Sequence, residues 1–111
     1  MSSKPILQVI AMDCPPEDEE KFNKWYNESH VPLIFKYKGV NEAARYRRVG
    51  ENEEYPKYLA LFEYESKEAQ DAQFSSPEGA AVGEDVKKSW PDGLPPAKWA
   101  VQYELIKKWQ K

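Results

Sequence analysis

The stretch Tyr58-Leu59-Ala60-Leu61-Phe62-Glu63-Tyr64 decides the fold, because it is the clearest β-strand in the sequence. Aromatic and aliphatic side chains occur at both parities of this stretch, within a predicted strand over 55–65. The predicted strand over 5–12 has the same character, with Ile6, Gln8, Ile10 and Met12 on one face and Leu7, Val9 and Ala11 on the other. Two strands of this kind need cover on both faces of their sheet.

On both sides of this stretch, predicted strands are interspersed with amphipathic or capped helical segments. The other predicted elements are a helix over 17–30, a strand over 40–49, a helix over 66–74, a more broken helix over 77–90 and a strand over 98–106. The order is βαββαβ, the split βαβ arrangement of ferredoxin-like domains. We therefore predict one α+β domain over 1–111 with a ferredoxin-like protomer.

In that arrangement both helices cover one face of an antiparallel sheet. The other face, in the strands over 5–12 and 55–65, is also apolar, and the chain has no spare element to cover it. A second copy of the chain is the simplest cover, so we expect a homodimer formed through the sheet face.

Composition excludes several classes of function. Sixteen Lys and Arg stand against nineteen Asp and Glu, a formal charge of −3, and the nearest basic block, Arg45–Arg48, lies in a predicted strand and points to both faces. We expect no nucleic-acid partner. We also expect no membrane partner and a cytoplasmic location, since no apolar run reaches the ~20 residues of a membrane span, no signal pattern opens the chain, and Cys14 is the lone cysteine.

The predicted helix over 17–30 carries the only histidine of the chain. Phe22, Tyr26 and His30 follow one another by four, so they share one helix face, with Trp25 beside them. A histidine on an aromatic face is a candidate acid or base near neutral pH, with Tyr26 to orient it. The alternative is structural: His30 caps carbonyls at the helix end or fixes a kink before Pro32.

A second candidate lies in the strand over 40–49. Either Arg45 and Arg47 face the helices, or Tyr46 and Arg48 do; the sequence leaves this parity open. An inward arginine could hold a carboxylate or an enolate-like oxygen. The alternative is that these arginines form cross-strand or intersubunit ion pairs with Glu63 and Glu65.

No metal or cofactor is expected from the residues. One His and one Cys make a poor zinc site, and the sequence contains no Gly-x-Ser-x-Gly elbow, phosphate-binding glycine loop or dinucleotide fingerprint.

The signature Phe22-x-x-Trp25-Tyr26-x-x-x-His30-x-Pro32, followed by Gly39-Val40, Arg45-Tyr46 and the strand Tyr58–Tyr64, resembles the EthD-like branch of the dimeric α/β-barrel superfamily. The resemblance implies a homodimer whose sheets form a dimeric α/β barrel, with a pocket between helices and sheet in each protomer. Members of the superfamily include cofactor-independent monooxygenases, haem-degrading enzymes, muconolactone isomerases and dehydratases or cyclases. EthD itself is more similar to an accessory protein.

These patterns together predict a dimer that binds a small aromatic or polyketide-like compound. If it is an enzyme, His30 and Tyr26 are the catalytic candidates. The substrate-binding candidates are Phe22, Trp25, Arg45, Tyr46 and Arg47. The alternatives are a non-catalytic accessory or binding module in which His30 is structural, and a haem-handling protein.

Overall fold

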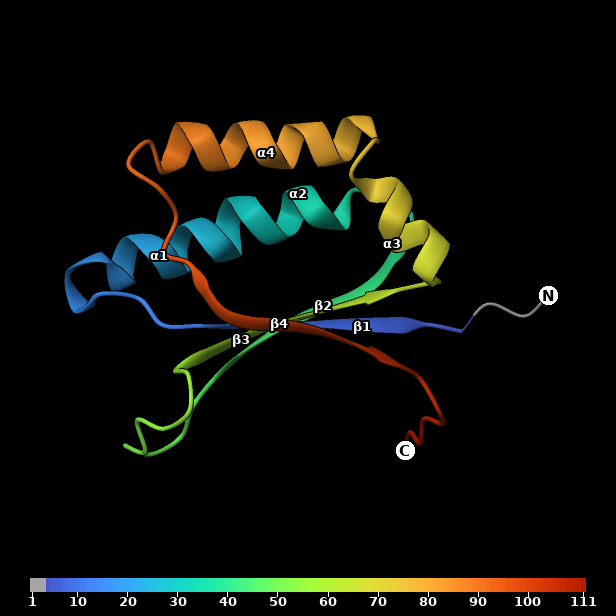
Figure 1. Cartoon of the computed structure of the whole chain (residues 1–111), viewed down its shortest axis with the longest axis horizontal. Helices are drawn as coiled ribbons and strands as arrows, with labels where there is room; N and C mark the ends of the chain where they lie inside the picture. Colours follow the sequence, from blue (N-terminus) through green and yellow to red (C-terminus); the bar gives the residue numbers. More distant parts are fainter. Residues whose placement is uncertain (1–3) are drawn as a thin grey trace.

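The computed structural model describes residues 4–111 and has one antiparallel sheet at its centre (Figure 1). Its strands are β1 (Ile6–Met12), β2 (Val40–Arg47), β3 (Tyr58–Tyr64) and β4 (Ala97–Glu104), in the order β2-β3-β1-β4. The predicted α+β ferredoxin-like fold is confirmed, and strand bounds agree to within about three residues. Residues 1–3 of the predicted domain lie outside the described part.

The helices lie on one side of this sheet. A 3₁₀ turn (Pro16–Asp18) leads into α1 (Glu19–Trp25), a π-helical turn (Tyr26–His30) and α2 (Val31–Phe35), and the later helices are α3 (Lys67–Gln73) and α4 (Pro77–Ser89). In Figure 1, α1 and α2 lie between the sheet and α4, and α4 contacts α2 and the π-helical turn.

Serine side chains begin both later helices. Ser66 Oγ accepts from the backbone N–H of Ala69 at 3.0 Å, as the cap spacing predicts, and Ser76 Oγ accepts from Gly79 N at 3.0 Å. The expectation of a broken helix after Pro77 is wrong: α4 is continuous over thirteen residues. Pro77 occupies the first helical turn, where its missing N–H costs no intrahelical bond.

Pro32 explains the π-helical turn. A proline cannot donate to the carbonyl four residues before it, so a regular helix is interrupted there. The chain accommodates this by widening, and the N–H of Val31 bonds to the carbonyl of Tyr26, five residues back. The expected kink before Pro32 therefore takes the form of one wide turn that carries Tyr26 and His30 inward.

The strand register assigns each parity to a face. Tyr58 pairs with Met12 on one side and with Arg47 on the other, so these residues and their alternates face the helices. The buried core on that side comprises Met12, Phe22, Trp25, Tyr26, Ile34, Tyr37, Val40, Tyr58, Ala60, Phe62, Tyr64 and Trp90.

The opposite face carries no helix and is mostly apolar. It presents Leu7, Val9, Ala44, Tyr46, Leu59, Leu61, Trp99, Val101 and Tyr103, together with Glu42 and Glu63, which both pair with Lys108. On β4 the side chains alternate: Trp99, Val101 and Tyr103 point to this face, while Ala100, Gln102 and Glu104 point the other way. We call this apolar surface the bare face.

Candidate functional site

An aromatic cluster fills the space between α1 and the sheet. The Phe22 ring is fully buried, 5.1 Å from Tyr26, 5.6 Å from Tyr58 and 6.4 Å from Trp90, measured between ring centroids. Trp25 packs edge-on against Trp90 at 5.8 Å. Rings at these distances leave little free volume, so this region is a packed core.

His30 belongs to this packed region. Its ring stacks on Trp25 at 4.4 Å and meets Tyr26 edge-on at 4.8 Å, and only 8% of the residue is exposed. Among residues 4–111, Nδ1 of His30 has no hydrogen-bond partner. Burial lowers the pKa of His30 to about 4, because the charged imidazolium is poorly solvated there. The imidazole is therefore neutral at physiological pH.

Asp85 on α4 holds the neighbours of His30 in place. Its Oδ2 accepts from Trp25 Nε1 at 2.8 Å and from Ser29 Oγ at 3.0 Å. The Asp85 carboxylate also raises the pKa of His30, but the effect of burial is larger. This carboxylate ties α4 to the turn that carries His30.

Tyr26 is equally enclosed. Its hydroxyl donates to Met12 Sδ at 3.3 Å, and burial raises the pKa of Tyr26 to about 12. A weak sulfur acceptor in the core leaves this phenol protonated and turned away from solvent.

Arg45 lies at the outer edge of the cluster. Its guanidinium carbon is 4.5 Å from the Tyr26 ring centroid, 5.6 Å from that of Tyr58 and 5.7 Å from that of Phe22. Burial lowers the pKa of Arg45, which is the expected effect of removing water from a cation. The aromatic faces compensate part of this cost through cation–π attraction.

Two asparagines of the first helical segment hold Arg45. Its Nη1 donates to Asn27 Oδ1 at 2.8 Å and its Nη2 donates to Asn23 Oδ1 at 2.9 Å. Both partners are neutral, and within residues 4–111 no carboxylate lies at ion-pair distance from Arg45 or Arg47.

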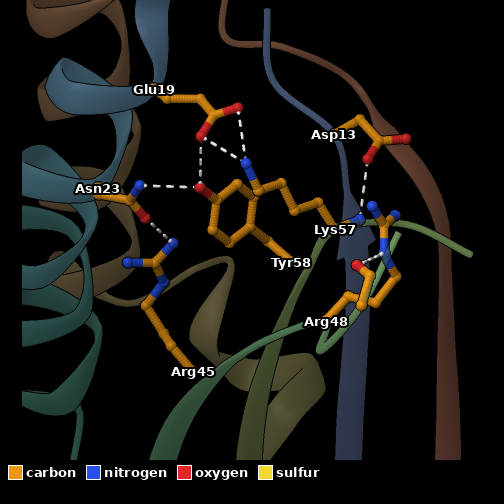
Figure 2. A network of polar contacts seen from close by, with 8 residues as sticks. Asp13, Glu19, Asn23, Arg45, Arg48, Lys57 and Tyr58 are labelled. Carbon is orange, nitrogen blue, oxygen red and sulfur yellow. Dashed lines mark hydrogen bonds and ion pairs between the residues drawn. The ribbon is translucent and has the colours of Figure 1, made fainter. Parts of the chain in front are cut away.

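A chain of hydrogen bonds extends from this pair (Figure 2). Asn23 Nδ2 donates to the Tyr58 hydroxyl at 3.1 Å, and the hydroxyl donates to Glu19 Oε2 at 2.8 Å. Lys57 Nζ lies 2.9 Å from the same Glu19 oxygen. The hydrogen bonds from Lys57 and Tyr58 lower the pKa of Glu19, so this carboxylate is ionised and already occupied.

A surface hollow of about 360 Å³ opens above this network, between α1 and the free edge of β2. It is lined by Asn23, Asn27, Arg45, Tyr46, Arg47 and Tyr58. We call it the arginine hollow. Its size lies within the range of small-ligand sites, and among residues 4–111 the only charged groups that line it are two guanidiniums.

The structure separates the predicted site residues into two layers. Arg45 and Arg47 face the helices and reach the hollow, which settles the parity of β2. Tyr46 alternates to the bare face and reaches the hollow only at the edge of the strand. Phe22, Trp25, Tyr26 and His30 lie beneath in the packed cluster, and none of them lines any of four surface hollows found among residues 4–111.

Two sequence-based expectations need correction here. The arginines of β2 form no cross-strand ion pair with Glu63 or Glu65 in the described residues; Glu63 instead bonds Lys108 at 2.9 Å. Ion pairs between subunits stay a prediction. The pocket implied between helices and sheet is occupied by aromatic rings. The reason is volume, since the rings of Tyr26, Tyr58 and Trp90 surround Phe22 where smaller side chains would leave a cavity.

Sequence reasoning missed Asn23, Asn27 and the polar role of Tyr58. The i, i+4 spacing of the two asparagines, on the flank of the aromatic face, was the available signal. Nothing in the sequence shows that Tyr58 meets Glu19, because that contact depends on the packing of α1 on β3.

The residues do not fit a haem group. An iron ligand needs open space beside it, whereas Trp25 and Tyr26 cover the His30 ring. The described residues also contain no cluster of His, Cys, Asp and Glu suited to a metal ion.

Comparison with known proteins places the chain in a family. The family model described as a domain of unknown function, DUF4286, matches residues 6–95. The chain belongs to the DUF4286 family. No curated protein matches the sequence.

Solved structures similar to this DUF4286 protein support the fold. An EthD family protein from Bacillus halodurans is 23% identical with a TM-score of 0.67, over 93% of this chain and 99% of the other. A dimeric protein of unknown function and ferredoxin-like fold from Bacteroides fragilis is 14% identical with a TM-score of 0.65, over 91% and 96%. A candidate antibiotic biosynthesis monooxygenase from Bordetella bronchiseptica is 16% identical with a TM-score of 0.69, over 94% and 99%.

The predicted resemblance to EthD-like, ferredoxin-like proteins is thereby confirmed at the level of the fold. Identities this low carry the fold alone. Residues 4–111 contain no helix that is both long and apolar enough to cross a membrane.

Proposed function

We propose that the protein is a homodimer that binds a small organic molecule in the arginine hollow of each protomer. The observation that carries this proposal is Arg45: a half-buried guanidinium, fixed by Asn23 and Asn27, that has no acidic partner among the described residues. Fixed, desolvated charge at the wall of a hollow is typical of a ligand site.

The bare face supports the dimeric part of the proposal. Tyr46 is 58% exposed, Tyr103 54% and Trp99 42%, all on the face without helices. A groove of about 480 Å³ also lies there, lined by Leu7, Leu61 and Tyr103 and by the charged Glu42, Glu63, Glu104 and Lys108, among others. Apolar area of this extent is typical of an interface, and the Bacteroides fragilis protein of the same fold is described as dimeric.

Cofactor-independent chemistry suits this arrangement when the ligand can ionise. Arg45 would stabilise negative charge that develops on an enolate or phenolate oxygen, as in cofactor-independent monooxygenase chemistry or in the proton transfers of isomerase and dehydratase or cyclase chemistry. The acid/base role of His30 and the orienting role of Tyr26 stay predictions, and their burial weighs against direct contact with a ligand in the hollow.

A second candidate is a non-catalytic binding module in the cytoplasm, in which His30 is structural. The stacked, neutral His30 ring favours it. Turnover of an identified ligand that survives His30→Ala would remove His30 from the chemistry, whereas loss of turnover with retained binding would restore its catalytic role.

Native mass spectrometry of the purified protein tests the proposal. We expect a mass near twice 12.9 kDa plus a small organic adduct, and loss of the adduct in Arg45→Gln. A monomer contradicts the dimer, and a bare dimer in a preparation soaked with cell metabolite extract contradicts the binding function.

A further inference from the structure

We propose that the arginine hollow recognises the carboxylate of a small, planar organic acid, which Arg45 and Arg47 bind together. This inference rests on the proposed function and specifies its ligand class. Arg45 supplies a fixed site on the wall of the hollow and Arg47 an adaptable one at its rim.

The charged groups that line the hollow indicate an anionic ligand. Its lining contains two guanidiniums, two amides and two phenols, and no acid. Glu19 is the nearby acid that interacts with Arg47, and it is already bonded to Lys57 and Tyr58. The hollow therefore keeps its positive charge, and a bound anion would neutralise it.

The unused hydrogen-bond donors of Arg45 also indicate an anionic ligand. A guanidinium has five N–H donors, and Arg45 gives one to Asn23 and one to Asn27. Within residues 4–111 no further acceptor is bonded to it. The rings beneath fix the plane of the group, so the remaining donors are oriented before a ligand arrives.

A carboxylate suits the charge around the hollow better than a phosphate does. The chain carries four consecutive acids at 17–20, one turn before Asn23, and their field makes each added negative charge on a ligand less favourable. Carboxylates and phosphates both pair with a guanidinium through two parallel hydrogen bonds, so the preference for a carboxylate rests on its smaller charge.

The remaining lining favours a flat molecule. Tyr58 contributes aromatic surface, and the hollow measures about 360 Å³, room for one ring with its carboxylate. We therefore identify the ligand class as a monocyclic aromatic or enolisable carboxylic acid.

Titration of the full chain with three probes, followed by amide chemical shifts and calorimetry, tests this assignment. The probes are benzoate, benzamide as its neutral isostere, and inorganic phosphate. We expect saturable benzoate binding, and binding at least about tenfold weaker for benzamide and for phosphate. Benzoate should also protect Asn23 and Asn27 side-chain amide signals from broadening, since it fixes Arg45.

Three variants locate the site. Arg45→Gln and Arg47→Gln should each weaken benzoate binding about tenfold, whereas Lys36→Gln removes the same charge from an exposed position outside the hollow and should leave the affinity unchanged. Arg47 is exposed, so its substitution tests the site even if Arg45→Gln does not fold.

Each contrary outcome is distinct. Equal affinity for benzoate and benzamide, or tighter binding of phosphate, overturns the carboxylate assignment and leaves the proposed small-molecule function in place. Absence of saturable benzoate binding, or an equal loss in Lys36→Gln, overturns it too. Failure of the proposed function itself appears separately, in the native mass spectrum, as a dimer without any organic adduct.

Discussion

At the scale of the residue, His30 shows how burial changes the chemistry of a side chain. A solvated imidazole titrates near neutral pH, but stacking on Trp25 and the loss of water lower the pKa of His30 to about 4. The folded protein therefore favours the neutral ring, and protonation of His30 at acid pH destabilises the fold.

This pKa predicts an acid-dependent loss of stability. In the unfolded chain His30 binds its proton near pH 6.5, and in the folded protein only near pH 4, so the unfolded state binds more protons between these values. The free energy of unfolding should fall by about 3 kcal/mol as pH drops from 6.5 to 4, and this contribution should level off below roughly pH 3. Urea denaturation across this range measures it.

His30→Phe provides the comparison, because a ring of similar shape keeps the stack and cannot titrate. We expect its stability at pH 7.5 to lie within about 1 kcal/mol of the wild type, since no hydrogen bond to Nδ1 is lost. Its free energy of unfolding should fall less steeply between pH 6.5 and pH 4, because the part due to His30 is absent. Equal slopes in the two proteins would show that His30 is solvated in the folded state.

Asp85 offers a second residue-scale prediction. Asp85→Ala leaves the indole N–H of Trp25 without its acceptor, and should cost about 1–3 kcal/mol of stability in urea denaturation. Asp85→Asn keeps an acceptor oxygen, so it should recover most of the loss while lowering the pKa of His30 further, as followed by NMR. Glu84→Ala, at an exposed position next to Asp85, is the control. If it lost as much stability as Asp85→Ala, the cause would be the lost helix charge and not the hydrogen bond to Trp25.

At the scale of the element, sequence patterns predict which helices and strands exist, and their order, better than they predict strand parity and packing. The strands and the Ser66 cap follow from apolar runs and cap chemistry, which are local. The parity of β2 depends on its pairing with β3, which no local pattern fixes, so the inward position of Arg45 could not be derived. The filling of the pocket by rings depends likewise on packing across the whole layer.

Two glycines of α4 provide an element-scale prediction with its own control. A Cβ at Gly79 would collide with the backbone carbonyl of Gln73, whereas one at Gly83 meets no heavy atom within 4 Å in the described part of the chain. Gly79→Ala should therefore destabilise the protein by roughly 1–3 kcal/mol. Gly83→Ala should stabilise it by about 0.5–1 kcal/mol, because it removes a flexible residue from a helix. Thermal unfolding compares them, and a stabilising Gly79→Ala would show that the α3–α4 junction is looser than the structure has it.

At the scale of the whole molecule, the two faces of the sheet differ in what covers them. The helix side is closed by an aromatic core, and the arginine hollow opens only at its β2 edge. The bare face presents apolar side chains from all strands. A small protein with this much exposed apolar surface gains by covering it, and a second copy offers the same surface in return.

The dimer proposed on these grounds depends on the centre of the bare face. Leu61 pairs with Val9 on β1 and with Ala44 on β2, so it lies in the middle of that face. Leu61→Asp would bury an unpaired charge in the interface, and we expect the mass from light scattering to fall from about twice 12.9 kDa to that of one chain. Val49→Asp introduces the same charge at a residue that is 96% exposed and outside the strands, and should leave the dimer intact. A folded Leu61→Asp variant that remains dimeric would place the interface elsewhere, and the apolar residues of the bare face would then need another partner.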